Sequence, residues 1–208
     1  MSILVLTSDT LSSPAAVGQI EYSSPIFAAT PIGTQRGIVP TQQYYRLNAD
    51  LVGANVNTAQ SVFGVGVTLS SSTVYAFEAV YAFSKSAGVT SNTIAIGFAG
   101  TATVNNILYD VITSILNSTS TVNINTTQTV GYVNTTAATV VTNAVGTANA
   151  TSSVVIRGTV SVNAGGTFIP QYTLSAAPGG AYSTVAGSYF LIYPIGASGS
   201  ATNVGTWA

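Results

Sequence analysis

Residues 74–84, VYAFEAVYAFS, alternate between two kinds of position and decide the fold class. One set of alternate positions carries the large aromatic residues, at Tyr75, Phe77, Tyr81 and Phe83, together with Ala79. The other set carries Val, Ala and a single carboxylate, Glu78. Because successive side chains of a strand point to opposite faces of a sheet, this period of two predicts a β-strand with one buried aromatic face.

Similar short apolar segments, separated by turn residues, run along most of the chain. At residues 153–175 we expect a hairpin, in which SVVIRGTVSV, a glycine-containing turn at 163–166 and TFIPQYTLS follow one another. Further strands are predicted at 61–69, 93–98, 106–112, 129–133, 139–143 and 189–195. About eight short strands at this spacing predict an all-β fold, a jelly-roll-like antiparallel β-sandwich.

Two segments depart from this pattern. Residues 1–34, in which Ser, Thr and Pro interrupt short apolar pieces, predict an extended N-terminal arm ahead of a single β domain at 35–208. Residues 117–153 are rich in Thr, Asn, Ala and Val and predict long edge strands or loops of weakly specified register. Both segments are expected to contact neighbouring molecules.

The arm carries apolar residues near its start. Ordering them against a partner would bury apolar surface, which can outweigh the backbone entropy lost. The predicted attachment anchors are Ile3, Val5 and Leu6. The alternative is that the arm adds an edge strand to its own domain or to a sister subunit.

Charge is scarce in this chain. Four basic and five acidic residues make up 4% of its 208 residues, whereas an ordinary globular chain carries about 25% charged residues. The net charge of −1 provides no clustered Lys and Arg to neutralise phosphates, so we expect no nucleic-acid ligand. A charge this close to zero also removes the self-repulsion that keeps proteins apart, and it suits dense packing of identical copies.

The chain contains no cysteine and no histidine. It therefore has no thiol nucleophile, no disulfide, no zinc site of the usual Cys/His kind and no imidazole general base. We expect no enzymatic activity, no catalytic residue, no cofactor and no metal. A carboxylate pair brought together by folding, as in glycosidases, stays open as the alternative.

Membrane and export signals are weak. Residues 190–192 form one of the longest apolar runs, far short of the roughly 18 residues needed to cross a bilayer, so no membrane span is expected. The opening MSILVLTSDT lacks the charged region and the apolar length of a secretory signal. We therefore interpret the N-x-[ST] triplets as chance products of an Asn- and Thr-rich composition; they begin at Asn117, Asn125, Asn134 and Asn149.

Two groups of residues are candidates for a functional role. A surface-recognition patch is predicted at Tyr44, Tyr45 and Arg46, since aromatic faces beside a cation suit a saccharide; the alternative is a packing role. A structural charge pair is predicted between Glu78 and Arg157, because a charge within a sheet is rarely left unpaired. The alternative for these two residues is that both face solvent.

Three stretches resemble a module of virion proteins from tailed phages, especially marine and cyanobacterial ones. They are TPIGTQRGIVPTQQYYRLN at 30–48, GANVNTAQSVFGVGVTLSSSTVYAFEAVYAFSKSAGVTSNTI at 53–94, and RGTVSVNAGGTFIPQYTLSAAPGGAYSTVAGSYFLIYPIGASGSATNVGTWA at 157–208. The resemblance covers the chain from about residue 20 onward and is weakest at 117–153. In that family the module often ends long tail fibres, whereas here only a short arm precedes it. This difference favours a small accessory protein on the particle.

The resemblance implies a structural protein on the virion exterior, made in the host cytoplasm and of the capsid-decoration, cement or head-fibre type. Its expected partners are further copies of itself, as a homotrimer, and the capsid, portal or tail proteins to which the arm attaches. The alternative function is a receptor-binding adhesin of a tail or head fibre, for which a host surface glycan is the expected ligand. The resemblance implies no catalytic residue.

Overall fold

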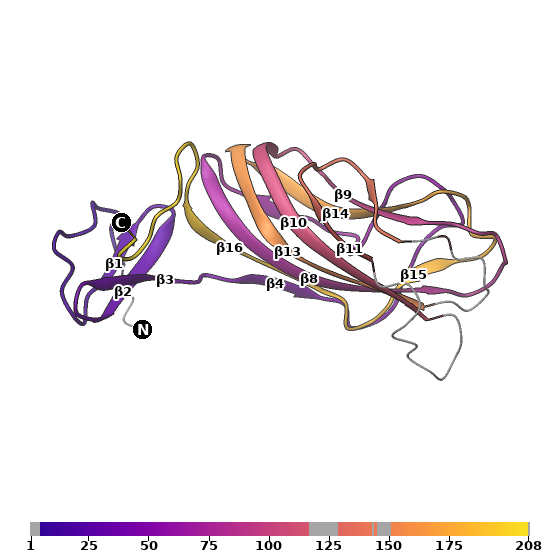
Figure 1. The fold of residues 1–208 in the computed structure, drawn as a ribbon, viewed down its shortest axis with the longest axis horizontal. Helices are drawn as coiled ribbons and strands as arrows, with labels where there is room; N and C mark the ends of the chain where they lie inside the picture. Colours follow the sequence, from indigo (N-terminus) through magenta and orange to yellow (C-terminus); the bar gives the residue numbers. More distant parts are fainter. Residues whose placement is uncertain (1–4, 117–128, 143, 145–150, 208) are drawn as a thin grey trace.

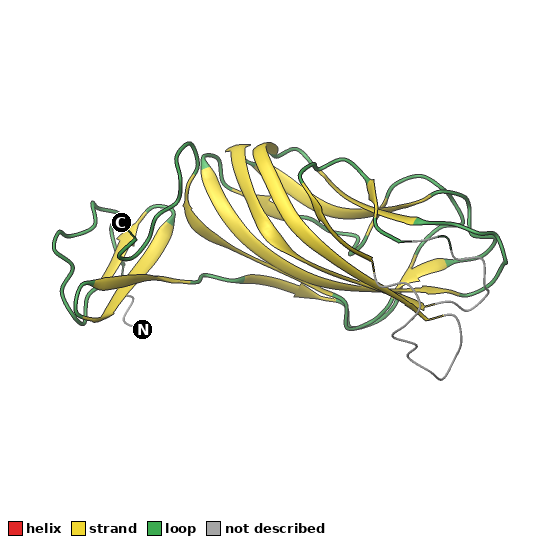
Figure 2. Ribbon diagram, viewed as in Figure 1, coloured by secondary structure: helices red, strands yellow, loops and turns green. Residues whose placement is uncertain are grey.

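The computed structural model describes residues 5–116, 129–142, 144 and 151–207. The secondary structure of these residues consists of β-strands, and none of them lies in a helix, as Figure 2 shows. All strand pairs are antiparallel. The predicted all-β antiparallel fold is confirmed.

The larger of two facing sheets has eight strands. Their order is β11-β10-β13-β8-β15-β5, and β16 and β4 extend the sheet from the same edge of β8 that also pairs with β15. The three long central strands are β8 (Thr73–Lys85), β10 (Thr103–Leu116) and β13 (Thr151–Ala164). The shorter strands are β4 (Gln43–Arg46), β5 (Leu51–Val52), β11 (Thr129–Val133), β15 (Tyr182–Thr184) and β16 (Tyr189–Ala197).

The second sheet has five strands in the order β12-β9-β14-β6, with β7 also paired to β14. Its strands are β6 (Gln60–Ser61), β7 (Val67–Leu69), β9 (Ile94–Ala99), β12 (Thr139–Val140) and β14 (Gly166–Leu174). The two sheets lie face to face in Figure 1 and form a jelly-roll-like sandwich.

Aromatic rings fill the space between the sheets. The five alternate β8 positions predicted to be buried are at most 4% exposed. Phe77 of β8 packs edge-on against Phe98 of β9 at 5.6 Å between ring centroids, and Phe98 stacks on Phe168 of β14 at 4.6 Å. Contacts of this geometry add to the stabilisation from burial alone. The strand predicted from residues 74–84 therefore forms the centre of the core.

The predicted hairpin at 153–175 is wrong, although both of its strands exist. β13 pairs with β8 and β10 in the larger sheet, whereas β14 pairs with β6, β7 and β9 in the smaller one. The chain crosses between the sheets at Gly165 and Gly166, where a Cβ atom would lie within 3 Å of neighbouring atoms, such as the Leu69 carbonyl oxygen and the Ala102 amide nitrogen. A glycine-containing turn between two strands is compatible with a hairpin in one sheet and with a crossover between two sheets. The sequence pattern therefore could not distinguish these two connections.

Residues 20–39 form a small three-stranded sheet, so the prediction of an extended arm at 1–34 is wrong for residues 20–34. Its strands are β1 (Ile20–Ser23), β2 (Ile26–Ile32) and β3 (Gln35–Val39). The buried positions of β2 are Ile26, Ala28 and Thr30, whereas the half-buried positions include Phe27. The large apolar residue Phe27 thus lies on the less buried face, and the small residues Ala28 and Thr30 lie on the buried face. The sequence therefore lacks the alternation of apolar and polar residues by which a strand is recognised.

The small sheet lies at one end of an elongated molecule, and the sandwich, whose first strand is β4, extends away from it (Figure 1). Both ends of the described chain lie at the small-sheet end (Figure 1). The predicted domain boundary between residues 34 and 35 therefore falls inside this sheet, just ahead of β3.

Candidate functional site

One row of side chains crosses the outer face of the larger sheet from edge to edge. Strand register places its members opposite one another on β11, β10, β13, β8, β16 and β4. We call this set the cross-sheet row; in order, it consists of Tyr132, Asp110, Arg157, Glu78, Leu191 and Tyr44. With neighbouring strands about 4.8 Å apart, the row is about 24 Å long.

Three of the nine charges of the chain occupy the middle of this row. Glu78 and Arg157 are opposite partners on β8 and β13, as the predicted pair requires, and both are exposed, as the alternative requires. The ion pair that forms joins Arg157 to Asp110 on the other side, with 3.8 Å between Nε and Oδ2. Their side chains are 71% and 57% exposed, so the pair contributes at most about 1 kcal/mol to stability.

Glu78 is bound instead by a tyrosine from the neighbouring strand. The Tyr189 hydroxyl donates a hydrogen bond to Glu78 Oε1 at 2.7 Å. This bond to the carboxylate, assisted by partial burial and by the negative charge of Glu78, raises the pKa of Tyr189 to about 12. This pKa shift is what a phenol that donates to a carboxylate should show, because the bond favours the protonated form of the phenol.

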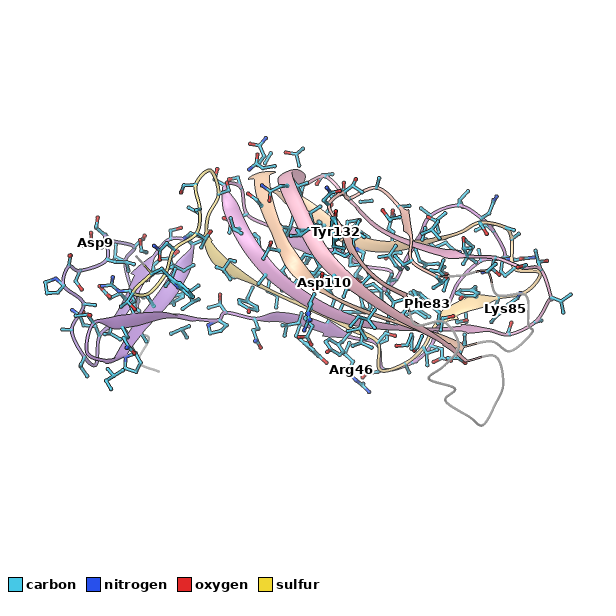
Figure 3. The ribbon with its side chains drawn as sticks, in the orientation of Figure 1. Asp9, Arg46, Phe83, Lys85, Asp110 and Tyr132 are labelled. Carbon is cyan, nitrogen blue, oxygen red and sulfur yellow. The ribbon has the colours of Figure 1, made fainter. Side chains whose placement is uncertain are left out.

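Aromatic rings stand at both ends of the row. Tyr132 is 74% exposed and lies next to Asp110 in register, and Figure 3 labels both residues. At the other end, Tyr44 is 55% exposed and stacks on Tyr189, with ring centroids 5.5 Å apart. Two exposed aromatic faces thus flank the charged centre.

A hollow of about 440 Å³ adjoins the centre of the row. Glu78 and Arg157 border it, and small side chains such as Ala76 and Thr159 form part of its lining. Tyr193 closes it on the β16 side. The face is therefore concave beside its charged groups.

The predicted patch at Tyr44, Tyr45 and Arg46 does not form one surface. Tyr44 lies in the cross-sheet row, whereas Tyr45 points to the other side of β4 and packs edge-on against the core residue Phe63 at 5.6 Å. Arg46 donates a hydrogen bond to Asn48 Oδ1 at 2.8 Å. Because neighbouring residues of a strand point to opposite faces of the sheet, only Tyr44 and Arg46 of these three residues can lie on the same face.

Tyr45 borders a second cavity, at the mouth of the sandwich between β4 and β7. Its volume is about 310 Å³ and its lining is mainly apolar. Gly66 belongs to this lining, and a Cβ atom there would lie 2.6 Å from the Ile169 side chain. Close approach of the backbone to β14 accounts for this glycine.

The predicted attachment anchors lie before the small sheet. Ile3 falls outside the described residues, Val5 is 77% exposed, and Leu6 is partly buried. From Ser8 onward the segment is bound to the sheet: Ser8 Oγ accepts a hydrogen bond from the Ser24 amide, and the Asp9 amide donates to the Tyr22 carbonyl.

The small sheet contains an ion pair that sequence reasoning missed. Arg36 Nε donates to Glu21 Oε2 at 2.8 Å, and both side chains are only about 15% exposed. The Ser12 amide donates to Glu21 Oε1 at 2.7 Å. Hydrogen bonds from Ser12, with Arg36 beside the carboxylate, hold the pKa of Glu21 below its usual value. No sequence signal marks this pair, because its members are 15 residues apart on strands that were not predicted.

Lys85 is a further charged residue whose position was not predicted from the sequence, because it is buried. Its side chain is 2% exposed at the end of β8, where Nζ donates to the Thr90 carbonyl at 2.8 Å. Burial lowers its pKa. Its place on the aromatic face of β8, two residues after Phe83, is the signal that could have identified it.

The remaining sequence features add no further site. Asn134 is exposed just after β11, and the other three asparagines of N-x-[ST] triplets lie outside the described residues. Within the described ranges, no three acidic side chains converge as metal ligands, and no helix is long and apolar enough to cross a bilayer. No family model, curated protein or solved structure matches the chain.

Proposed function

We propose that this chain is a structural protein on the exterior of a bacteriophage particle, of the capsid-decoration, cement or head-fibre type. We further propose that it acts as a homotrimer and attaches through its N-terminal end to capsid, portal or tail proteins. The observation that carries the proposal is the two-ended layout, with the small sheet and both ends of the described chain at one pole and the sandwich at the other (Figure 1). Such a molecule can attach at one pole and display the other.

The composition supports the same role. Since only 4% of the residues are charged, the surface must be hydrated mainly through uncharged polar groups. Identical copies of such a chain can pack densely on a particle without mutual repulsion. The resemblance of residues 30–94 and 157–208 to a virion module is in agreement with this proposal.

Cryo-electron microscopy of intact virions, with quantitative mass spectrometry of their proteins, tests the location. We expect density for the sandwich outside the capsid, with the small sheet at its attached end, and a copy number that is a multiple of three. Absence of the chain from purified virions would contradict the proposal.

Deleting residues 2–6 tests the attachment. This deletion removes Ile3, Val5 and Leu6 but keeps Ser8 and Asp9, whose hydrogen bonds belong to the small sheet. The truncated protein should remain folded and oligomeric but fail to join particles. In the matched control, Val17→Ser changes a residue that is 63% exposed in the same part of the chain, and attachment should persist. Normal decoration by the truncated protein would refute attachment through these anchors.

The cross-sheet row favours a second candidate, a receptor-binding adhesin that displays its sandwich to the host surface. Exposed tyrosines flanking hydrogen-bonding charges are suited to recognition, because aromatic residues provide large contact areas at low entropic cost. Density for the chain at the tip of a tail or head fibre would favour this candidate over a decoration protein.

A further inference from the structure

We infer that the outer face of the larger sheet is a binding site for an uncharged saccharide, centred on the cross-sheet row. The inference goes beyond the virion role, because it assigns a ligand class to a surface, and it holds whether or not the chain is found on a particle. It depends on how the nine charges of the chain are used.

Seven of those nine charges make a hydrogen bond within the described part of the chain. Four of them serve the chain's own structure through longer-range contacts: Glu21 and Arg36 join the small sheet, Asp50 accepts from the Ala186 amide, and Lys85 binds a carbonyl. Asp9 and Arg46 bind residues one and two positions away.

Arg157 and Asp110 are the two charged residues whose side chains make no hydrogen bond to the described residues. They lie side by side at the centre of the row, where they form only the 3.8 Å ion pair. Glu78, on the opposite side of Arg157, accepts from Tyr189 through one oxygen and has no described partner for the other. The charged groups that can still bind a ligand through hydrogen bonds are thus gathered at one place, the centre of the cross-sheet row.

The pattern of donors and acceptors matches the hydroxyl groups of a sugar. The two carboxylates accept hydrogen bonds and the guanidinium between them donates, so the row reads acceptor, donor, acceptor across three strands. A hydroxyl group can donate to one of these groups and accept from the next. Hydrogen bonds to charged groups are about twice as strong as neutral ones, so few are needed.

The aromatic ends fit the other surface of a sugar ring. Pyranose rings expose C–H groups on their faces, and these pack against aromatic rings. Tyr132 presents such a face at one end and the stacked pair Tyr44 and Tyr189 presents another. The length of about 24 Å between the ends suits an oligosaccharide of several units, and the 440 Å³ hollow beside Glu78 and Arg157 can hold a side branch.

Two other occupants fit less well. An anionic ligand would face two carboxylates and one guanidinium, a balance that opposes negative charge. A second copy of this chain would bury three charges at the centre of a subunit contact, and such centres are depleted in charged residues because desolvation is costly. The row is therefore better suited to an uncharged, hydroxyl-rich ligand.

The test is an array of uncharged and anionic oligosaccharides probed with the purified full-length protein, followed by titration calorimetry with the best-bound uncharged oligosaccharide. We expect uncharged glycans to bind. The variants Asp110→Asn and Tyr132→Ala should each raise Kd at least about tenfold. Both residues are exposed, so folding should be unaffected.

The matched controls lie at the other end of the molecule. Asp9→Asn and Trp207→Ala change an exposed carboxylate and an aromatic residue that is 79% exposed, and Kd should not change; Figure 3 labels Asp9 beside the small sheet. The inference is overturned if the protein binds no glycan, if it binds anionic glycans alone, or if the row variants bind as the wild type does. Loss of oligomers in the row variants, measured by sedimentation, would also overturn it by assigning the face to a subunit contact.

Discussion

Buried tyrosine hydroxyls differ in how well the core satisfies them. Tyr172 donates to the Tyr182 carbonyl at 3.0 Å, and burial, with Tyr182 nearby, raises the pKa of Tyr172 to about 12. Tyr81 is fully buried on β8, and its hydroxyl has no partner among the described residues. An unsatisfied buried hydroxyl costs about 1–3 kcal/mol, so these two similar residues should respond oppositely to loss of their oxygen.

We therefore expect Tyr81→Phe to raise the free energy of unfolding by about 1 kcal/mol, because it removes a desolvated hydroxyl and keeps the ring. Its matched variant, Tyr172→Phe, should lower the free energy of unfolding by about 1 kcal/mol, because it leaves the Tyr182 carbonyl without its donor. Urea denaturation of both variants measures the difference. A clear loss of stability in Tyr81→Phe would mean that its hydroxyl is satisfied.

Glu21 makes the small sheet sensitive to acid. Its folded pKa lies below the unfolded value of 4.5, so its contribution is fully present above that value and is lost as the pH falls through the folded pKa. The Ser12 amide, which donates to Glu21, should therefore lose protection from hydrogen exchange as the pH falls below 4.5. Glu21→Gln should lower protection at neutral pH and flatten this dependence, whereas Asp9→Asn should leave it unchanged. Full protection of Ser12 in Glu21→Gln would refute the role of the carboxylate.

Strand β13 contains a glycine for a packing reason. Gly158 lies between Phe77 and Tyr109 in register, and those two rings approach to 6.1 Å between centroids. A Cβ atom on Gly158 would lie 2.6 Å from Tyr109 Cβ and even closer to the Leu108 carbonyl oxygen. At this position β10 thus leaves no room for a side chain on β13.

Gly158→Ala should lower the free energy of unfolding by about 1–3 kcal/mol, since the contact is with backbone and cannot relax cheaply. Gly131 on β11 is the matched control, because it is exposed and a methyl group added there would have nothing within 4 Å of it. Gly131→Ala should be neutral or gain about 0.5 kcal/mol from the restricted unfolded chain. Thermal unfolding of both variants decides the matter, and equal effects at the two positions would contradict the packing account.

Prediction from sequence succeeded where side-chain size followed the strand period. Residues 74–84 have that property, and their buried face was assigned correctly. Residues 26–30 do not, because Phe27 is less buried than Ala28, and the strand was missed. Strand pairing could not be predicted for a separate reason. The alternation within a strand indicates which side chains are buried, but it does not indicate which strand lies beside it. The strands β13 and β14 could therefore be predicted, although the hairpin between them was wrong.

The candidate site shows the same limit. Glu78 and Arg157 stood out as rare charges within strands, and the register does place them opposite each other. Asp110 was not singled out, although it is the ion partner of Arg157, because only the order of β10, β13 and β8 brings the three charges into one row. Tyr189 was missed likewise, since its bond to Glu78 spans 111 residues.

The molecule as a whole uses its charges locally, which bears on assembly. Seven of its nine charged residues make a hydrogen bond within the described part of the chain, and the Arg157 and Asp110 pair is exposed. Few charges are therefore left to hold one subunit to another. Large exposed apolar side chains such as Val52 and Val140 offer the other means of association.

The proposed homotrimer should accordingly be insensitive to salt. Raising NaCl from about 0.1 M to about 1 M shortens the screening length from about 10 Å to about 3 Å and weakens ion pairs, but it leaves apolar contacts intact or strengthens them. Sedimentation equilibrium at both concentrations should return the trimer mass, and particles should retain the protein at about 1 M NaCl. The variant Arg157→Gln should behave as the wild type does, because its charge is directed at the outer face. A monomer at micromolar concentration would refute the trimer itself, whereas a trimer that dissociates at high salt would show that charges from the nine do cross the subunit boundary.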